Sequence, residues 1–174
     1  MVFNLIRFHK PEEENGYLSN WYMSNFTLGD KTYCCVEQYI MEQKALMFAD
    51  LIAAEQIMQT TDPQTMQSLG RSVKGFNQLE WDGKKQLIVY KALIAKFEQN
   101  IELMGRLIST GTATFVECSK SDKVWGIGLG MKDDISDMGK WQGENLLGFT
   151  LCEVRTELMR KIVCQYSSRK DSLT

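Results

Sequence analysis

The chain has 174 residues, of which 44% are hydrophobic, and its 20 basic and 22 acidic residues give a formal net charge of −2. This length and composition predict one globular domain with a buried core, and they exclude an intrinsically disordered chain. Proteins that hold duplex DNA by its phosphates usually carry a basic surface, so we expect no stable binding to duplex DNA.

The cysteine and histidine content argues against a metal site. None of the five cysteines forms a C-x-x-C pair, and His9 is the one histidine of the sequence. We therefore expect no metal and no other cofactor. An odd number of cysteines without a recognisable secretion signal predicts reduced thiols and a cytoplasmic location. Because no apolar segment approaches the roughly 18–20 residues of a membrane span, we expect no membrane partner.

The N-terminal half predicts short strands followed by helices. Residues 2–8 alternate loosely, which favours an edge strand, and residues 26–28 and 31–33 flank Gly29-Asp30, which predicts a tight hairpin. Helix-forming residues with apolar positions at helical spacing predict helices over residues 36–50 and 51–59. Asp62-Pro63 is typical of an N-cap and a first helical turn, and we expect Gly70 to end that third helix.

The C-terminal half predicts two longer helices separated by a strand and a loop. An apolar stripe over residues 84–109 predicts one long helix, which Gly111 ends, and residues 114–118 form a short strand. Residues 122–142 contain four glycines and few periodic apolar residues, which indicates a long functional loop before a last helix over residues 144–163. The predicted fold is helix-rich α+β, a single compact domain with a few short strands beside a helical core.

Glu37 and Lys44 form the first group of candidate functional residues. Seven residues separate them on one predicted helix, so both side chains lie near the same face, about 10 Å apart along the axis. An acid and an amine so placed suit the two ends of one small ligand. The spacing alone favours the alternative interpretation, which is a pair of solvated charges on a helix surface.

The second group lies in the glycine-rich loop, where Asp122 and Trp125 are three residues apart and Gly126 follows. An indole face stacks on a heterocyclic base, and a glycine lets the backbone approach a ligand closely. The alternative is a core tryptophan beside an aspartate that forms a turn. The glycine spacing matches neither a P-loop nor a dinucleotide-binding motif.

Other positions carry weaker signals. Asn145 lies near the predicted start of the last helix, where anions bind and an amide side chain contacts a sugar or base, although capping and packing are the alternative. Trp81 precedes the long helix as a stacking platform or a hydrophobic staple. Ser19 and Asn20 lie in a loop, where a simple turn is the alternative.

The order of these motifs resembles the NADAR family of N-glycosidases from near residue 3 to near residue 160. The resemblance rests on separated blocks that agree in order and type. These blocks are residues 17–22, 36–39, 43–45, 69–71, 81, 92–100, 122–128, 145–148 and 154–155. One departure is the segment 129–140, which is longer than in a minimal member and carries three aspartates, Asp133, Asp134 and Asp137. This departure leaves the choice of substrate open.

The resemblance implies a function and a set of site residues. Some family members act on ribosylamino-pyrimidine phosphates of early riboflavin synthesis, and others remove ADP-ribose from guanine in nucleic acid. Residues 1–165 would form the N-glycosidase domain, followed by a polar tail over residues 166–174. The implied catalytic residues are Glu37, Lys44 and Asp122, and the implied substrate-binding residues are Ser19, Asn20, Arg71, Trp81, Trp125, Gly126 and Asn145.

A mechanism for cleaving a glycosidic C–N bond fits these residue types. One carboxylate would stabilise positive charge at the anomeric carbon, and a general acid would protonate the leaving nitrogen. A partly neutral Lys44 would attack the anomeric carbon and form a Schiff base, the route that the resemblance also implies. Trp81 and Trp125 would clamp the base, and Arg71 or the last helix's N-terminus would receive a phosphate. The alternative function is a module that binds ADP-ribose or a nucleotide without turnover.

Overall fold

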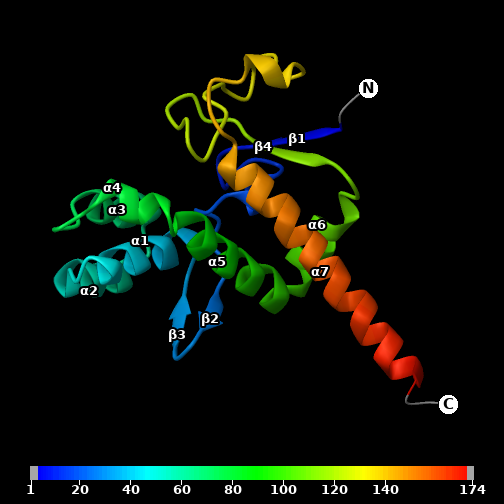
Figure 1. Ribbon diagram of the computed structural model, residues 1–174, viewed down its shortest axis with the longest axis horizontal. Coiled ribbons are helices and arrows are strands. Elements are labelled where there is room, and N and C mark those ends of the chain that lie inside the picture. The colour runs from blue at the N-terminus through cyan, green and yellow to red at the C-terminus, as the bar shows by residue number, and fades with distance from the viewer. Residues whose placement is uncertain (1–3, 172–174) are drawn as a thin grey trace.

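The computed structural model describes residues 4–171, with side chains through residue 165, and its architecture is shown in Figure 1. Helices dominate it, and its strands form two separate pairs, which confirms the predicted helix-rich α+β class. The elements are β1 Leu5–Phe8, η1 Gly16–Leu18, β2 Phe26–Leu28, β3 Lys31–Tyr33, α1 Val36–Met47, α2 Leu51–Gln59, α3 Pro63–Arg71, α4 Gln78–Asp82, α5 Lys85–Gln99, α6 Ile101–Ser109, β4 Thr114–Glu117, η2 Met138–Lys140 and α7 Leu146–Asp171. None of the described helices is long and apolar enough to cross a membrane.

The predicted N-terminal strand pairs with the strand that follows the long helical region. β1 and β4 run parallel, with Phe8 opposite Glu117. Residues 2 and 3 of the predicted strand lie outside the described residues. Because the two strands are parallel, their carboxyl ends meet at one edge, and the segments that follow them leave from the same place.

The predicted hairpin is present as β2 and β3, and the backbone of Gly29 adopts a φ of 64° at its turn. Its outer edge is covered by a side chain from α5. The amide of Gln99 accepts from the Thr27 N–H and donates to the Thr27 carbonyl oxygen, both at 2.8 Å. These two bonds satisfy backbone groups that an edge strand otherwise leaves open.

Helices α1, α2 and α3 pack together at one side of the molecule, on the left in Figure 1. The Asp62 side chain caps α3 as predicted, accepting from two backbone N–H groups. Gly70 does not end α3, which continues to Arg71. A Cβ at Gly70 would lie 2.0 Å from the Met41 sulfur, so this glycine lets α3 approach α1 closely.

The predicted single helix over residues 84–109 is wrong, because the chain breaks at Asn100 into α5 and α6. Asn100 leaves the helical region, with φ −120° and ψ 86°. Its side-chain amide donates to the carbonyl oxygens of Lys96 and Asn25. Asparagine favours such bonds to nearby backbone over helical continuation. The short helix α4, which carries Trp81, was also absent from the prediction.

The last helix, α7, runs from Leu146 to Asp171, so it starts two residues later and ends later than predicted. It packs on α5 and β4 and then extends away from the body of the molecule (Figure 1). Leu151 and Val154 of α7 join Phe97 and Phe115 in the largest buried hydrophobic cluster. The loop between β4 and α7, yellow to gold in Figure 1, lies above the helical part.

Candidate functional site

Glu37 lies in the first turn of α1, with 6% of its surface exposed. Its backbone N–H donates to the Asn20 carbonyl oxygen at 2.9 Å, which ties the start of α1 to the preceding loop. Burial raises the pKa of the Glu37 carboxyl to about 7, and the charge of Asp122 adds to this effect. A hydrogen bond from the Trp21 side chain and the charges of Arg71 and Lys44 oppose it. A carboxyl group with this pKa holds or releases a proton near neutral pH.

Lys44 lies two turns further along α1, where aromatic rings shield its amine. Its Nζ lies 4.1 Å from the ring centroid of Phe76 and 5.7 Å from that of Trp81. Burial lowers the pKa of the Lys44 amine, and the positive charge of Arg71 lowers it further, while Glu37 opposes the shift. A lowered pKa makes the neutral, nucleophilic amine more abundant.

Asp122 reaches this region from the loop that follows β4. Its Oδ1 accepts the backbone N–H groups of Val124 and Trp125 at 2.9 and 2.8 Å, so the carboxylate both orders the loop and stays fixed. Its charge acts on the Glu37 carboxyl, as described above. Asp122, 85 positions from Glu37 in the sequence, and Lys44 therefore both act electrostatically on the Glu37 carboxyl. Trp125 is partly buried against the main core cluster.

The predicted pair Ser19 and Asn20 forms a buried turn beside Glu37. The Ser19 hydroxyl accepts the Trp21 N–H at 3.2 Å. Among the described residues, Asn20 Oδ1 is the one buried side-chain nitrogen or oxygen without a hydrogen-bond partner. An acceptor left unpaired in this way is costly unless another donor reaches it.

Asn145 and Gly126, unlike the other predicted site residues, are buried against the backbone of β4. Asn145 is completely buried, and its side chain accepts from the Glu117 N–H at 3.0 Å and donates to the Phe115 carbonyl oxygen at 2.8 Å. It therefore joins β4 to the start of α7. Gly126 is also buried, and a Cβ there would lie 2.8 Å from the Glu117 carbonyl oxygen and 3.0 Å from that of Asp122. Its close backbone approach is thus to the protein's own chain.

Three residues near the site were not predicted. Trp21 hydrogen bonds to Glu37, and Phe76 shields Lys44. The Lys96 amine is completely buried and donates to the backbone oxygens of Tyr17 and Ser19 at 2.7 and 3.1 Å. Burial lowers the pKa of Lys96 to about 7. Trp21 and Lys96 lie in residues 17–22 and 92–100, two of the segments that carry the family resemblance, so the resemblance could have indicated them. Nothing in the sequence indicated Phe76.

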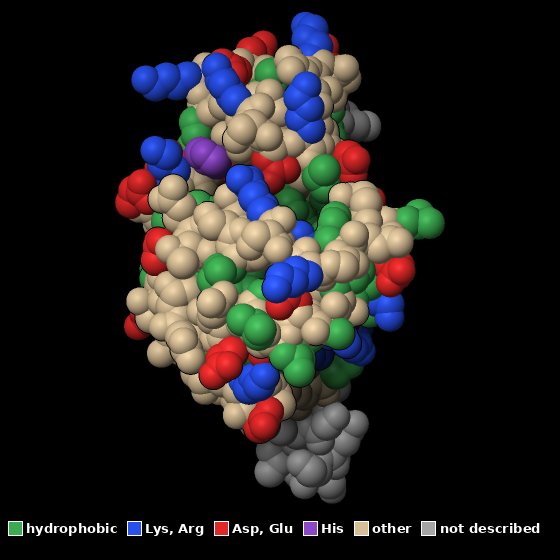
Figure 2. All heavy atoms as spheres, turned by 90° about the vertical axis from the view of Figure 1, so that its left-hand side faces the viewer, with side chains coloured by type: hydrophobic (Ala, Val, Ile, Leu, Met, Phe, Trp, Pro, Cys, Tyr) green, Lys and Arg blue, Asp and Glu red, His purple; other side chains and the backbone are tan. Residues whose placement is uncertain are grey.

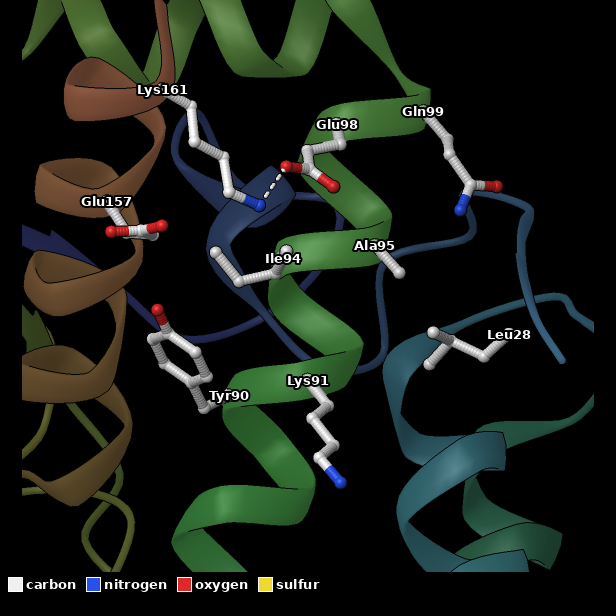
Figure 3. A pocket seen from close by; sticks show the side chains of 9 residues that line it. All are labelled: Leu28, Tyr90, Lys91, Ile94, Ala95, Glu98, Gln99, Glu157 and Lys161. Carbon is white, nitrogen blue, oxygen red and sulfur yellow. Dashed lines mark hydrogen bonds and ion pairs between the residues drawn. The ribbon is translucent and has the colours of Figure 1, made fainter. Parts of the chain in front are cut away.

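Figure 2 shows the side of the molecule on which α1, α2, α3 and α4 lie in Figure 1. A recess separates the upper part of this face from the lower part, and hydrophobic, acidic and basic side chains come together along it. A second hollow lies elsewhere, between β2, α5 and α7, and contains none of the predicted site residues. Figure 3 shows that an ion pair of 2.6 Å between Lys161 and Glu98 crosses it.

Comparison with known proteins connects this geometry to a family. A family model described as the NADAR domain matches residues 7–159. An N-glycosidase of Acanthamoeba polyphaga mimivirus is 41% identical over 145 residues, which make up 80% of this chain and 85% of that protein. A riboflavin biosynthesis protein of Vibrio vulnificus is 29% identical over 153 residues, or 88% of this chain and 38% of that protein.

The fold itself also has a solved counterpart. The N-glycosidase YbiA of Escherichia coli is 31% identical over 158 residues, which cover 91% of each chain. The NMR structure of YbiA matches with a TM-score of 0.77 at 30% identity, covering 94% of this chain and 89% of that one.

Proposed function

This chain belongs to the NADAR family and is a hydrolase acting on N-glycosyl compounds, and we propose that its substrate is an N-ribosylated base. The observation that carries the proposal is that Lys44 and Asp122 both act electrostatically on the buried Glu37 carboxyl. Glu37 and Lys44 each have a pKa shifted toward neutrality. Titratable groups with shifted pKa values at one place are typical of catalytic sites.

The proposed reaction starts with the neutral amine of Lys44. Its nitrogen forms a bond to the anomeric carbon while the bond to the base breaks, and the leaving nitrogen takes a proton from the Glu37 carboxyl group. The resulting Glu37 carboxylate accepts a proton from the lysine nitrogen and passes it to the ribose ring oxygen, whose bond to the anomeric carbon breaks as the protonated Schiff base forms. Asp122 stabilises the positive charge that builds on the sugar. Water then adds to the Schiff base carbon while Glu37 transfers a proton from that water to the lysine nitrogen. The bond to Lys44 breaks, the sugar aldehyde loses its remaining proton to Glu37, and the free sugar leaves the neutral amine and the protonated acid behind.

Borohydride trapping tests this covalent route. With substrate present, reduction should add the mass of the reduced sugar to the intact protein, and peptide mapping should locate the adduct on Lys44. Lys44→Arg keeps the positive charge but lacks the nucleophilic amine, so we expect no adduct and a loss of about 100-fold or more in kcat, the scale typical of removing one catalytic group. Lys91→Arg, an exposed position on α5, is the matched control and should keep both the adduct and the activity. Normal turnover by Lys44→Arg would exclude the covalent route.

Two substrate classes fit the proposal, ADP-ribosylated guanine in nucleic acid and a ribosylamino-pyrimidine phosphate of riboflavin synthesis. Arg71 is exposed at the end of α3 and acts electrostatically on both Glu37 and Lys44, which suits a phosphate bound beside them. The indole of Trp125 is partly exposed and would stack on the base. Trp81 is only 7% exposed, so its main contribution would be to shield the amine.

Measuring base release from the two substrates side by side separates the two classes. Faster release from one class identifies it as the preferred substrate. Tight binding of ADP-ribose with no release from either would replace the proposed hydrolase with the nucleotide-binding module considered from the sequence.

The proposed location is the cytoplasm. In a cytoplasmic enzyme the thiols stay reduced, and Cys34, Cys35, Cys118 and Cys152 are free thiols in keeping with such a location.

A further inference from the structure

A second titratable pair lies beside the site, where the parallel strands end. His9 follows β1 directly and Glu117 is the last residue of β4, so the parallel pairing brings together two residues 108 positions apart. The His9 Nδ1 and Glu117 Oε1 atoms are 2.7 Å apart, a short hydrogen bond. The proposed reaction uses neither residue.

Glu117 connects this pair to the site. Its residue is 6% exposed, and its backbone N–H is fixed by the Asn145 side chain. A Cβ at Gly126 would lie 3.2 Å from the Glu117 Cγ and 3.0 Å from the Asp122 carbonyl oxygen. The absence of a side chain at Gly126 therefore lets the Glu117 side chain pack against the segment that begins with Asp122.

His9 connects the pair to solvent, because 37% of its side chain is exposed against 9% for Glu117. The charged groups that act on Glu117 are His9, Asp122 and Glu13, and those that act on His9 are Glu117, Glu13 and Lys10. Glu13 and Lys10 come from the loop that follows β1. The pair thus lies between a solvated loop on one side and a site carboxylate on the other.

We propose that His9 and Glu117 form a proton-sharing pair whose charge acts on the Asp122 carboxylate. The pair thereby helps to set the pH range in which the site is active. Burial raises the pKa of Glu117 to about 7, and the hydrogen bond to Glu117 raises the pKa of His9. The pair therefore changes its total charge near neutral pH. The part of this inference that concerns activity rests on the proposed function, whereas the electrostatic link does not.

The link is measurable without turnover, by NMR titration of glutamate carboxyl carbons after labelling with ¹³C. The Glu117 resonance is the one that disappears in Glu117→Gln. Because Asp122 raises the pKa of Glu117 and His9 lowers it, Asp122→Asn should move the Glu117 midpoint to lower pH and His9→Gln should move it to higher pH. Asparagine at 122 keeps the Oδ1 acceptor for the two backbone N–H groups that Asp122 binds, so the loop stays intact. Asp134→Asn, an exposed change in the same loop, is the control and should leave the midpoint unchanged.

A Glu117 midpoint that is the same in Asp122→Asn as in the natural protein would overturn the inference. The chain's single histidine gives a second readout, because its imidazole signal needs no assignment. The His9 midpoint should lie above that of an ordinary histidine and fall in Glu117→Gln, since the group that raises it is gone. A His9 midpoint unaffected by Glu117→Gln would also contradict the pairing.

Activity provides the third readout and separates the two proposals. Glu117→Gln removes a charge that forms near pH 7 beside Asp122, so the kcat/KM profile should move along the pH axis while KM at the optimum is kept. A purely structural role would lower activity at all pH values without moving the profile, and that result would overturn the inference. Absence of turnover with every N-riboside would remove the proposed function, yet leave the NMR link as evidence for the pair.

Discussion

The buried carboxyl group of Glu37 makes a specific prediction about stability as a function of pH. In the unfolded chain this group ionises near its ordinary pKa of 4.5, whereas in the folded protein it keeps its proton up to about pH 7. The folded state therefore loses stability relative to the unfolded state as the pH rises from about 4.5 to about 7, and the loss stays constant above that range. The full shift corresponds to about 3 kcal/mol.

Glu37→Gln removes this titration while keeping a side chain of similar size. Between about pH 5 and about pH 8.5, the stability of the variant relative to the natural protein should rise by about 2–3 kcal/mol, because part of the loss is already present at the lower pH. N-glycosidase activity should fall at the same time, since the variant lacks the acid. A gain in stability joined to a loss of activity is typical of a group kept for function.

Urea unfolding at the two pH values measures the effect as a double difference, so the titration of all other groups cancels. Glu12→Gln, in the exposed acidic loop, is the matched control and should give the same stability difference at both pH values. If the stability difference between Glu37→Gln and the natural protein did not change with pH, Glu37 would not be a desolvated carboxyl group, and the reasoning about its acid role would fail.

Three further predictions concern the support of the site. Phe76→Ala exposes the Lys44 amine to water, which raises its pKa and leaves less of the neutral amine. The rate of Lys44 acylation at mildly alkaline pH, followed by peptide mapping, should therefore fall several-fold, since one pKa unit corresponds to a tenfold change. An unchanged rate would mean that Phe76 does not shield the amine. Asn145→Ala leaves two buried backbone groups unpaired and should cost about 2–5 kcal/mol in urea unfolding, and a cost below about 1 kcal/mol would contradict the buried bonds. Gly126→Ala places a Cβ 2.8 Å from the Glu117 carbonyl oxygen and should lower the melting temperature, which an unchanged value would refute.

Local signals in the sequence were sufficient for several elements. Gly29 with Asp30 specified the hairpin, because glycine adopts the positive φ that its turn requires. Asp62 and Pro63 specified the start of α3, since capping depends only on the residues of the first turn. The periodic apolar residues of α1 placed Glu37 and Lys44 on one helix, and that placement is local as well.

Tertiary contacts decided the rest. Asn100 ends α5 because its amide reaches the backbone of Asn25, and Gly70 continues α3 because α1 lies against it. No periodicity encodes such partners, since they come from distant segments of the chain.

The chemistry of the site also depends partly on the local sequence and partly on tertiary contacts. Glutamate, aspartate and lysine were evident from the sequence by type, but their pKa shifts come from burial and from charges that the fold brings close. His9 and Glu117 are adjacent only because β1 and β4 pair in parallel. The sequence by itself determined which groups are present, and packing decided which of them lose water and meet, because desolvation depends on all the neighbours in space.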